Sequence, residues 1–171
     1  MEVSPNFDKF CELSKEYDLV ALSVKLTADS ETPLSAYSKL SKLKPAFLFE
    51  SVVGGEQVSR FSFLGFSSSK LISCFQDYTE IKDHEGKNIQ IQTPDDPLKL
   101  IEDEIEGTRY HGLPGHRFSG GAIGYLGYEY ASRIEPSIPV PEEDQLKMPL
   151  TFFMITEIVI IFDHAHQSLT I

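Results

Sequence analysis

The chain has 171 residues, enough to bury one good hydrophobic core, and its length predicts one domain or at most two small ones. Hydrophobic residues make up 41% of it, which excludes a disordered acidic tail. Fifteen Lys and Arg residues stand against 26 Asp and Glu residues, and the formal net charge is −11. This balance argues against nucleic acid or an anionic membrane as a partner, because binding phosphate requires clustered cations.

The cysteine content and the hydropathy pattern indicate the compartment. Cys11 and Cys74 are the two cysteines of the chain, and they form no C-x-x-C pair, which favours a reducing, intracellular compartment. The longest apolar run, 158–162, is far too short to span a bilayer, and the N-terminus lacks a basic region followed by an apolar stretch. We therefore expect a cytoplasmic protein without a membrane segment.

The first third of the chain predicts alternating helices and strands. Apolar residues at helical spacing predict a helix over 7–17 that covers one face of a sheet, and alternation predicts a strand over 19–26. The pair at 32–33, Thr then Pro, is typical of a helix start, and this second helix ends before Pro45. The unbroken apolar run 47–49 predicts a strand covered on both faces.

The middle of the chain predicts an antiparallel meander followed by a third helix. An aspartate before Pro97 opens the helix, in which Leu98, Ile101 and Ile105 line one side and acidic residues line the other. The strands of the meander are expected at 60–64, 70–75, 79–82 and 88–92.

The last third combines a glycine-rich segment with the most apolar stretch. Segment 120–128 predicts a strand that turns into a helix through Arg133, and its glycines indicate close backbone approach, either between packed elements or to a ligand. A proline-rich connector over 136–149 precedes a strand over 150–162 and a hairpin that returns toward Ile171. Because the chain stops within a predicted strand, we expect a fragment of a longer protein.

The residues themselves indicate no catalytic constellation and no metal site. The histidine pairs, at 111 and 116 and at 164 and 166, lack a carboxylate or cysteine that would complete a ligand set at the usual spacing. No serine stands in a nucleophile-elbow context, and no cysteine has an obvious base.

Polar residues directly after the strand at 47–49 are the main candidates for a binding site. Glu50 and Ser51 follow that strand, and a buried carboxylate would require a partner such as Arg60 or a bound ammonium group. Alternatively, Glu50 leaves the sheet for solvent and Ser51 caps a turn, since Gly54 and Gly55 follow.

Four stretches of the chain together form a recognisable set. They are Phe-Leu-Phe-Glu-Ser at 47–51, Ser-Arg-Phe-Ser-Phe-Leu-Gly at 59–65, Asp-Pro-Leu at 96–98, and Gly-Gly-Ala-Ile-Gly-Tyr-Leu-Gly-Tyr-Glu at 120–129. Together they resemble the N-terminal region of anthranilate synthase component I. The resemblance covers nearly the whole chain in order, with Phe49 where leucine is commoner in that family and Phe61 where tyrosine is commoner.

This resemblance implies a fold, an activity and a regulatory site. It implies an α+β fold, a largely antiparallel sheet with packed helices, in the first part of a subunit that converts chorismate and ammonia to anthranilate with Mg²⁺. A glutamine amidotransferase, component II, supplies the ammonia, and the chorismate and Mg²⁺ residues are expected in a C-terminal part absent from this chain. Residues 1–171 would then be the regulatory N-terminal domain, with Glu50, Ser51 and, less directly, Arg60 contacting the inhibitor L-tryptophan.

Two alternatives remain open from the sequence. The large component of aminodeoxychorismate synthase shares the glycine-rich landmark and a similar N-terminal domain, although the Glu50-Ser51 pair favours the tryptophan branch. A non-catalytic module that recruits another protein by strand pairing is the other alternative.

Overall fold

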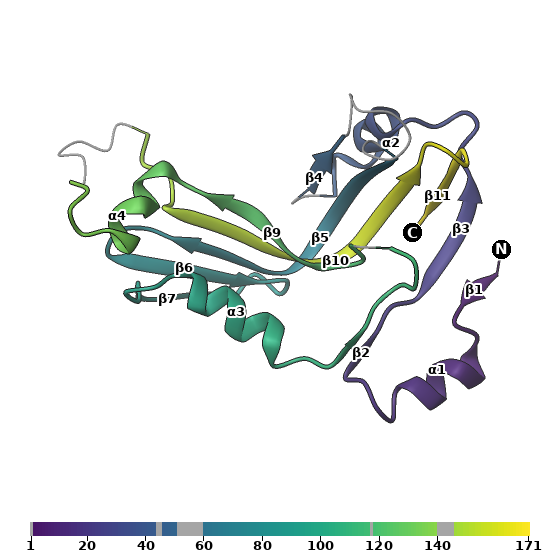
Figure 1. Cartoon of the computed structure of the whole chain (residues 1–171), viewed down its shortest axis with the longest axis horizontal. Helices are drawn as coiled ribbons and strands as arrows, with labels where there is room; N and C mark the ends of the chain where they lie inside the picture. The colour runs from purple at the N-terminus through teal and green to yellow at the C-terminus, as the bar shows by residue number, and fades with distance from the viewer. Residues whose placement is uncertain (1, 44–45, 51–59, 117, 140–145) are drawn as a thin grey trace. The chain divides into compact units, whose positions relative to one another are not determined.

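Two long strands, β5 (Phe61–Cys74) and β10 (Thr151–Asp163), organise the fold and contribute residues to both of its compact units. The computed structural model describes residues 2–43, 46–50, 60–116, 118–139 and 146–171. Unit 1 comprises Met1–Ser67, Thr108–Gly120 and Thr156–Ile171, and unit 2 comprises Ser68–Gly107 and Gly121–Ile155. Figure 1 shows the elements in chain order.

In unit 1 the strands follow the order β1-β3-β11-β10-β5-β4. The pairs β1–β3, β3–β11, β11–β10 and β4–β5 are all antiparallel. The shorter strands of this sheet are β1 (Val3–Ser4), β3 (Ser23–Thr27), β4 (Ala46–Phe49) and β11 (Ser168–Thr170). A separate parallel pair joins β2 (Leu19–Val20) to β8 (Tyr110–His111).

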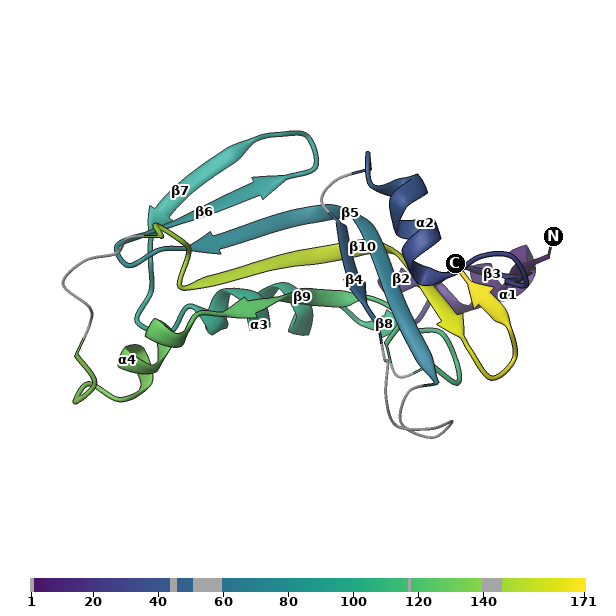
Figure 2. The same ribbon diagram turned by 90° about the horizontal axis from the view of Figure 1, so that it is seen from above.

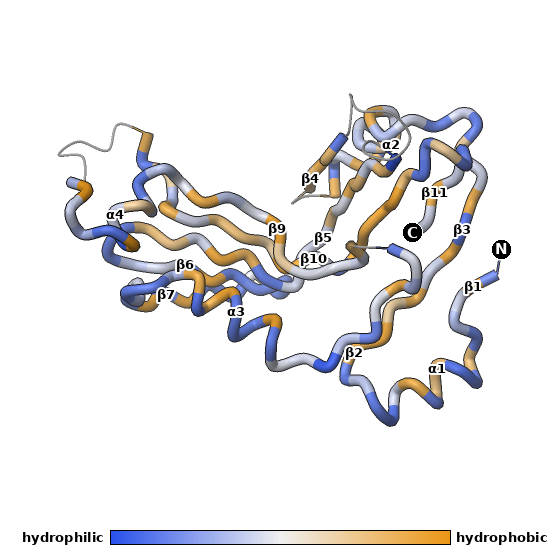
Figure 3. Tube along the Cα trace, viewed as in Figure 1, coloured by the Kyte–Doolittle hydropathy of each residue, from blue (hydrophilic) through white to orange (hydrophobic). Residues whose placement is uncertain are grey.

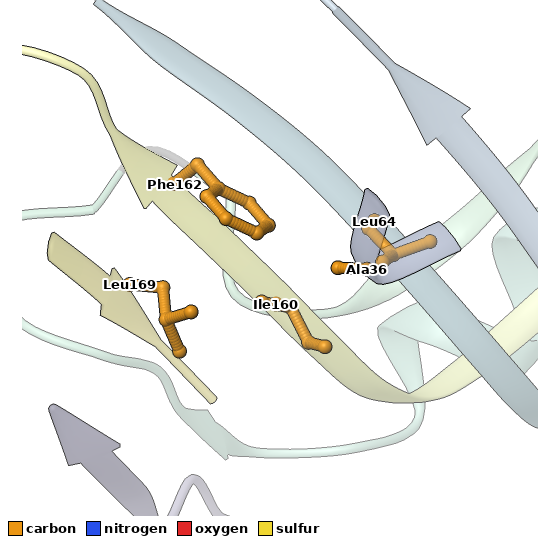
Figure 4. Packing of buried hydrophobic residues seen from close by; sticks show 5 residues of the cluster. All are labelled: Ala36, Leu64, Ile160, Phe162 and Leu169. Atoms are coloured by element: carbon orange, nitrogen blue, oxygen red, sulfur yellow. The ribbon is translucent and has the colours of Figure 1, made fainter. Parts of the chain in front are cut away.

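Helix α2 (Pro33–Leu40) covers one face of the sheet of unit 1. Its start is the predicted one: the Thr32 hydroxyl accepts from the Ser35 N–H at 3.1 Å, and the Ser35 hydroxyl accepts from the Thr32 N–H at 2.9 Å. This capping box satisfies two backbone donors that would otherwise lack partners. Ala36 of this helix joins four residues of the sheet in the buried cluster shown in Figure 4, namely Leu64, Ile160, Phe162 and Leu169.

Unit 2 has the strand order β9-β10-β5-β6-β7. Strands β6 (Tyr78–Asp83) and β7 (Asn88–Gln92) extend β5 as the predicted antiparallel meander, and β9 (Gly121–Leu126) pairs with β10. Helix α3 (Leu98–Glu106) lies along one face of this sheet (Figures 1 and 2). Its Ile101 joins Ile72 and Cys74 in a second buried cluster. A 3-10 turn, η1 (Tyr128–Tyr130), leads from β9 into α4 (Ala131–Ile134).

The predicted fold class is confirmed, since the described chain is α+β with a largely antiparallel sheet and packed helices. The predicted strand over 150–162 is also confirmed as β10, which contains the continuous apolar run 158–162 and is mostly hydrophobic along its length (Figure 3). The close backbone approach predicted for the glycine-rich segment occurs between packed strands, because a Cβ on Gly124 would lie 1.7 Å from the Phe152 carbonyl oxygen.

Three element predictions were wrong. The segment 19–26 forms two strands, because Leu19–Val20 pairs with β8 whereas Ser23–Thr27 pairs with β1 and β11. The expected break in 65–69 does not occur, since β5 continues through Ser67, which has a φ of 61° and donates to Glu157 Oε2 at 2.8 Å. Helix α1 (Phe7–Leu13) is shorter than predicted and buries only Leu13, so it presents no buried apolar face to a sheet.

Candidate functional site

The candidate site lies in unit 1, where β4 ends beside the beginning of β5. Phe49 pairs with Phe63 across these two strands, and Glu50 follows directly as an exposed residue. Ser51, the second predicted site residue, lies outside the described residues. Within the described chain, β4 has β5 as its one strand neighbour.

The prediction that the strand at 47–49 is covered on both faces was wrong. Phe49 is 53% exposed, although Phe47 is buried and Leu48 packs against the cluster beneath α2. Successive side chains of a strand point to opposite faces, so Phe49 and Leu48 cannot share the cover that α2 provides. Gly65 leaves space for the ring of Phe47, because a Cβ added at Gly65 would lie only 2.0 Å from Cε1 of that ring.

Arg60 forms an ion pair with Asp163 and not with Glu50. Its Nε donates to Asp163 Oδ1 at 3.0 Å, and its Nη2 donates to Asp163 Oδ2 at 2.7 Å. This fork-to-fork geometry is the strongest form of ion pair. The guanidinium carbon also lies 4.8 Å from the centre of the Phe61 ring. Arg60 is therefore held at the start of β5 by the end of β10, and the pairing of Arg60 with Glu50 that the sequence allowed is not formed.

The ion pair shifts the pKa values of both Asp163 and Arg60. Hydrogen bonding to Arg60 holds the pKa of the Asp163 carboxyl well below its usual range, against the opposing effect of burial, and hydrogen bonding to Asp163 raises the pKa of Arg60. His166 adds a third group, because its Nδ1 lies 2.9 Å from both Arg60 Nη2 and Asp163 Oδ2. That nitrogen accepts from Arg60 when it carries no proton and donates to Asp163 when it does.

A serine and a histidine also meet here without forming a catalytic arrangement. The buried Ser62 hydroxyl lies 2.8 Å from His164 Nε2. A nucleophilic serine requires a base that a carboxylate orients, but the Asp163 carboxylate is directed at Arg60 and His166. The Ser62–His164 contact therefore joins β5 to the turn after β10, and it indicates no hydrolytic activity.

Aromatic side chains line the opposite face of the same strands. Phe61 and Phe63 lie 6.4 Å apart, Phe63 meets Phe118 edge-on at 5.7 Å, and Phe61 lies 5.8 Å from the His116 ring. Burial is the main cause that lowers the pKa of His116, which favours its neutral ring among these aromatic neighbours. This face offers apolar surface for a planar ligand.

Sequence reasoning missed Asp163, His164, His166 and Ser62 as members of this cluster. Arg60 and Asp163 are 103 residues apart, so no local spacing could connect them. The signal available was limited to polar residues in the turn after a strongly apolar strand.

The described residues contain neither a metal site nor a membrane-spanning helix. No group of three or more His, Cys, Asp or Glu side chains in that part of the chain is arranged to hold a metal ion. None of the helices that the structure describes is both long and apolar enough to cross a bilayer.

Comparison with known proteins identifies relatives of this chain. No family model matches it. It is 32% identical to anthranilate synthase component 1 of Acetivibrio thermocellus over 98% of this chain and 33% of that protein. It is 35% identical to the protein of the same name from Acinetobacter calcoaceticus over 90% of this chain and 32% of that protein. The probable anthranilate synthase component 1 of Schizosaccharomyces pombe is 33% identical over the whole of this chain and 32% of that protein.

A solved structure was also found. The crystal structure of anthranilate synthase component I from Streptococcus pneumoniae TIGR4 is 25% identical, with a TM-score of 0.49 over 84% of this chain and 30% of that chain.

The sequence identities define the class of protein: the chain is an α+β protein homologous to part of a known enzyme subunit. Specifically, it is homologous to the N-terminal third of anthranilate synthase component 1. It spans about a third of the length of the curated relatives that it matches.

Proposed function

We propose that this chain is the N-terminal part of an anthranilate synthase component I, whose complete form converts chorismate and ammonia to anthranilate and pyruvate in tryptophan biosynthesis. The observation that carries this proposal is 32% identity along 98% of the chain with a relative of that name. The chorismate site and the Mg²⁺ ligands belong to a C-terminal part outside this chain, and a glutamine amidotransferase, component II, supplies the ammonia.

The proposed role of the present part is feedback inhibition by L-tryptophan. Glu50 is exposed directly after β4, whose last residue, Phe49, pairs with Phe63 across the two strands. A carboxylate in this position suits an ammonium group, and the phenyl faces suit an indole. Ser51, one residue further on, would hydrogen-bond the polar end of the ligand.

Arg60 has donors that its ion pair does not use. Its Nε and Nη2 face Asp163, and the guanidinium group carries two further N–H groups on Nη1. In the proposed site the Nη1 groups donate to the ligand carboxylate, and the hold of Asp163 on the guanidinium group lowers the entropic cost of binding. Inhibition requires that tryptophan bind more tightly to an arrangement in which the distant chorismate site is less competent.

The test is an assay of the full-length protein that contains this chain. Purified protein is mixed with chorismate, ammonium and Mg²⁺, and anthranilate is followed by its fluorescence, with and without tryptophan. Formation of anthranilate that tryptophan suppresses is the expected result. Formation of aminodeoxychorismate instead would assign the chain to the related synthase. No turnover of chorismate, or a native product on an immunoblot no longer than this chain, would overturn the enzymatic proposal.

A further inference from the structure

The turn between β10 and β11 holds Arg60, the residue just before β5, through backbone and side-chain contacts within unit 1 (Figure 1). The His164 N–H donates to Arg60 O at 2.9 Å, and the Asp163 carboxylate forms the bidentate pair with the Arg60 guanidinium. Asp163 Oδ1 also accepts from the N–H of His166 at 3.3 Å, within the turn. One short turn therefore fixes both the backbone and the side chain of Arg60.

Nη2 of Arg60 has two acceptors in this turn. It lies 2.7 Å from Asp163 Oδ2 and 2.9 Å from His166 Nδ1. A terminal guanidinium nitrogen carries two N–H groups, so each acceptor can take one of them when Nδ1 carries no proton. With Nε on Asp163 Oδ1, three of the five guanidinium N–H groups then have acceptors in the turn, and the two on Nη1 do not take part.

A proton on Nδ1 of His166 reverses this contact. The nitrogen can then no longer accept from Arg60, and it donates to Asp163 Oδ2, which lies 2.9 Å away. Two cations would share one carboxylate, with their nitrogens 2.9 Å apart. Arg60 therefore loses one acceptor, gains a neighbour of like charge and meets a competitor for Oδ2.

We propose that His166 is a positioning residue for Arg60 in the proposed tryptophan site, and that protonation of His166 weakens the binding of tryptophan there. This inference rests on the proposed function, in which Nη1 of Arg60 donates to the ligand carboxylate. With His166 neutral, the guanidinium is held by both acceptors, so less freedom is lost when tryptophan binds. By linkage, bound tryptophan in turn favours the neutral ring.

The direction of the effect depends on contact outweighing longer-range attraction. A protonated His166 would also attract a ligand carboxylate, but its side chain is 61% exposed, so water and salt screen that attraction. The contact with Arg60 is direct and is lost outright. We therefore expect a dissociation constant (Kd) for tryptophan about fivefold higher with His166 protonated, at the lower end of the usual range of coupling between two sites.

Three other charged or titratable side chains lie near this cluster, namely His164, His116 and Lys25. His164 belongs to the same turn, but its Nε2 contacts the Ser62 hydroxyl. His116 comes from the loop before β9 and interacts electrostatically with both members of the Arg60–Asp163 pair and with Lys25 of β3. Lysine side chains ordinarily keep their charge over the range in which histidine titrates, so the two other histidines are the groups to separate from His166.

The test is the Kd of labelled tryptophan, measured by equilibrium dialysis with the full-length protein that contains this chain. It is compared at about pH 5 and about pH 8, the ends of the range in which histidine changes charge, with circular dichroism to show that the protein is folded at both. The original protein should bind about fivefold more weakly at the lower pH. His166→Asn places an amide oxygen, an acceptor that takes up no proton in this range, at the δ position, and should bind equally at both.

His164→Asn and His116→Asn are the matched controls, since each removes another titrating ring beside Arg60 and should keep the pH dependence. Equal binding by the original protein at the two pH values, or tighter binding at the lower one, would refute the role of His166 and leave the tryptophan site itself standing. A pH dependence that persists in His166→Asn would do the same. Absence of tryptophan binding at either pH would instead refute the proposed regulatory function, and this inference with it.

Discussion

Replacing Gly124 by alanine tests the closest backbone contact in unit 2. Gly124 lies in β9, and an added Cβ would be 1.7 Å from the Phe152 carbonyl oxygen, 2.7 Å from its carbon and 2.8 Å from Phe153 Cα. All three are backbone atoms of β10, so no side-chain rotation relieves the overlap. Ordinary contact begins at 3.4 Å, so by subtraction the methyl group and the oxygen must separate by about 1.7 Å.

The expected cost follows from this displacement. Forcing an extra methyl group into a packed core costs about 1–3 kcal/mol, and an overlap with backbone places this variant near the upper end. Replacing glycine by alanine also restricts the unfolded chain, which stabilises by about 0.4–1 kcal/mol where the site is open. The clash is larger, and Phe153 and the neighbouring Ala122 both pack on the buried cluster of unit 2. We expect a net loss of about 2 kcal/mol, a fall in Tm of roughly 4–8 °C.

Thermal and urea unfolding, followed by circular dichroism, measure this loss. Gly107→Ala is the matched control, since it makes the same change at the end of α3 with an ordinary φ of −68°, where the added Cβ would lie 3.5 Å from the Asp103 carbonyl oxygen. That variant should be as stable as the original protein or slightly more so. Equal stability of the two variants would show that the strand contact does not limit residue size at Gly124.

Three further predictions concern regulation and pH. In the full-length enzyme, Ser51→Phe and Glu50→Gln should each weaken inhibition by tryptophan and leave uninhibited anthranilate formation nearly intact; unchanged inhibition would remove both residues from the site. Tyr130 donates to Asp96 Oδ1 at 2.8 Å, and burial, helped by Asp96, raises the pKa of Tyr130 to about 12. Because this folded-state pKa exceeds the ordinary value of 10, stability should be full below pH 10 and fall between pH 10 and 12, and Tyr130→Phe should reduce that fall in urea titrations. The pKa of Asp163 is depressed, so its contribution is present above the ordinary carboxyl range and is lost as the pH falls; Asp163→Asn should lower stability at pH 7 and flatten the acid side of the profile.

Local patterns predicted the elements whose cause is local. The helix start at Thr32 follows from a capping hydroxyl and a first-turn proline, and the start of α3 follows from Asp96, whose Oδ1 accepts from the Leu98 N–H at 3.0 Å. The meander β5–β6–β7 follows from alternation and turn residues. For the same reason the resemblance to a family could be stated from short stretches of residues.

These local patterns could not predict pairing between segments that are distant in the sequence. The parallel pair β2–β8 divides the predicted strand at 19–26 because Tyr110 and His111 lie beside Leu19 and Val20, and nothing near residue 19 indicates this. The run of serines at 67–69 is typical of a turn, yet hydrogen bonding of Ser67 to Glu157 on β10 keeps it within β5. Both outcomes are tertiary contacts that override local preference.

The contacts of Arg60 separate its two possible roles in the proposed tryptophan site. Its guanidinium group is fixed on two sides, by the carboxylate of Asp163 and by the ring of Phe61, so it cannot swing to neutralise Glu50 without breaking a bidentate pair. Glu50 is exposed directly after β4, and Arg60 pairs with Asp163 instead of with it. In the proposed site, the cation just before β5 and the carboxylate just after β4 suit the two charged ends of an amino acid, and on this ground we propose that unit 1 holds the feedback site.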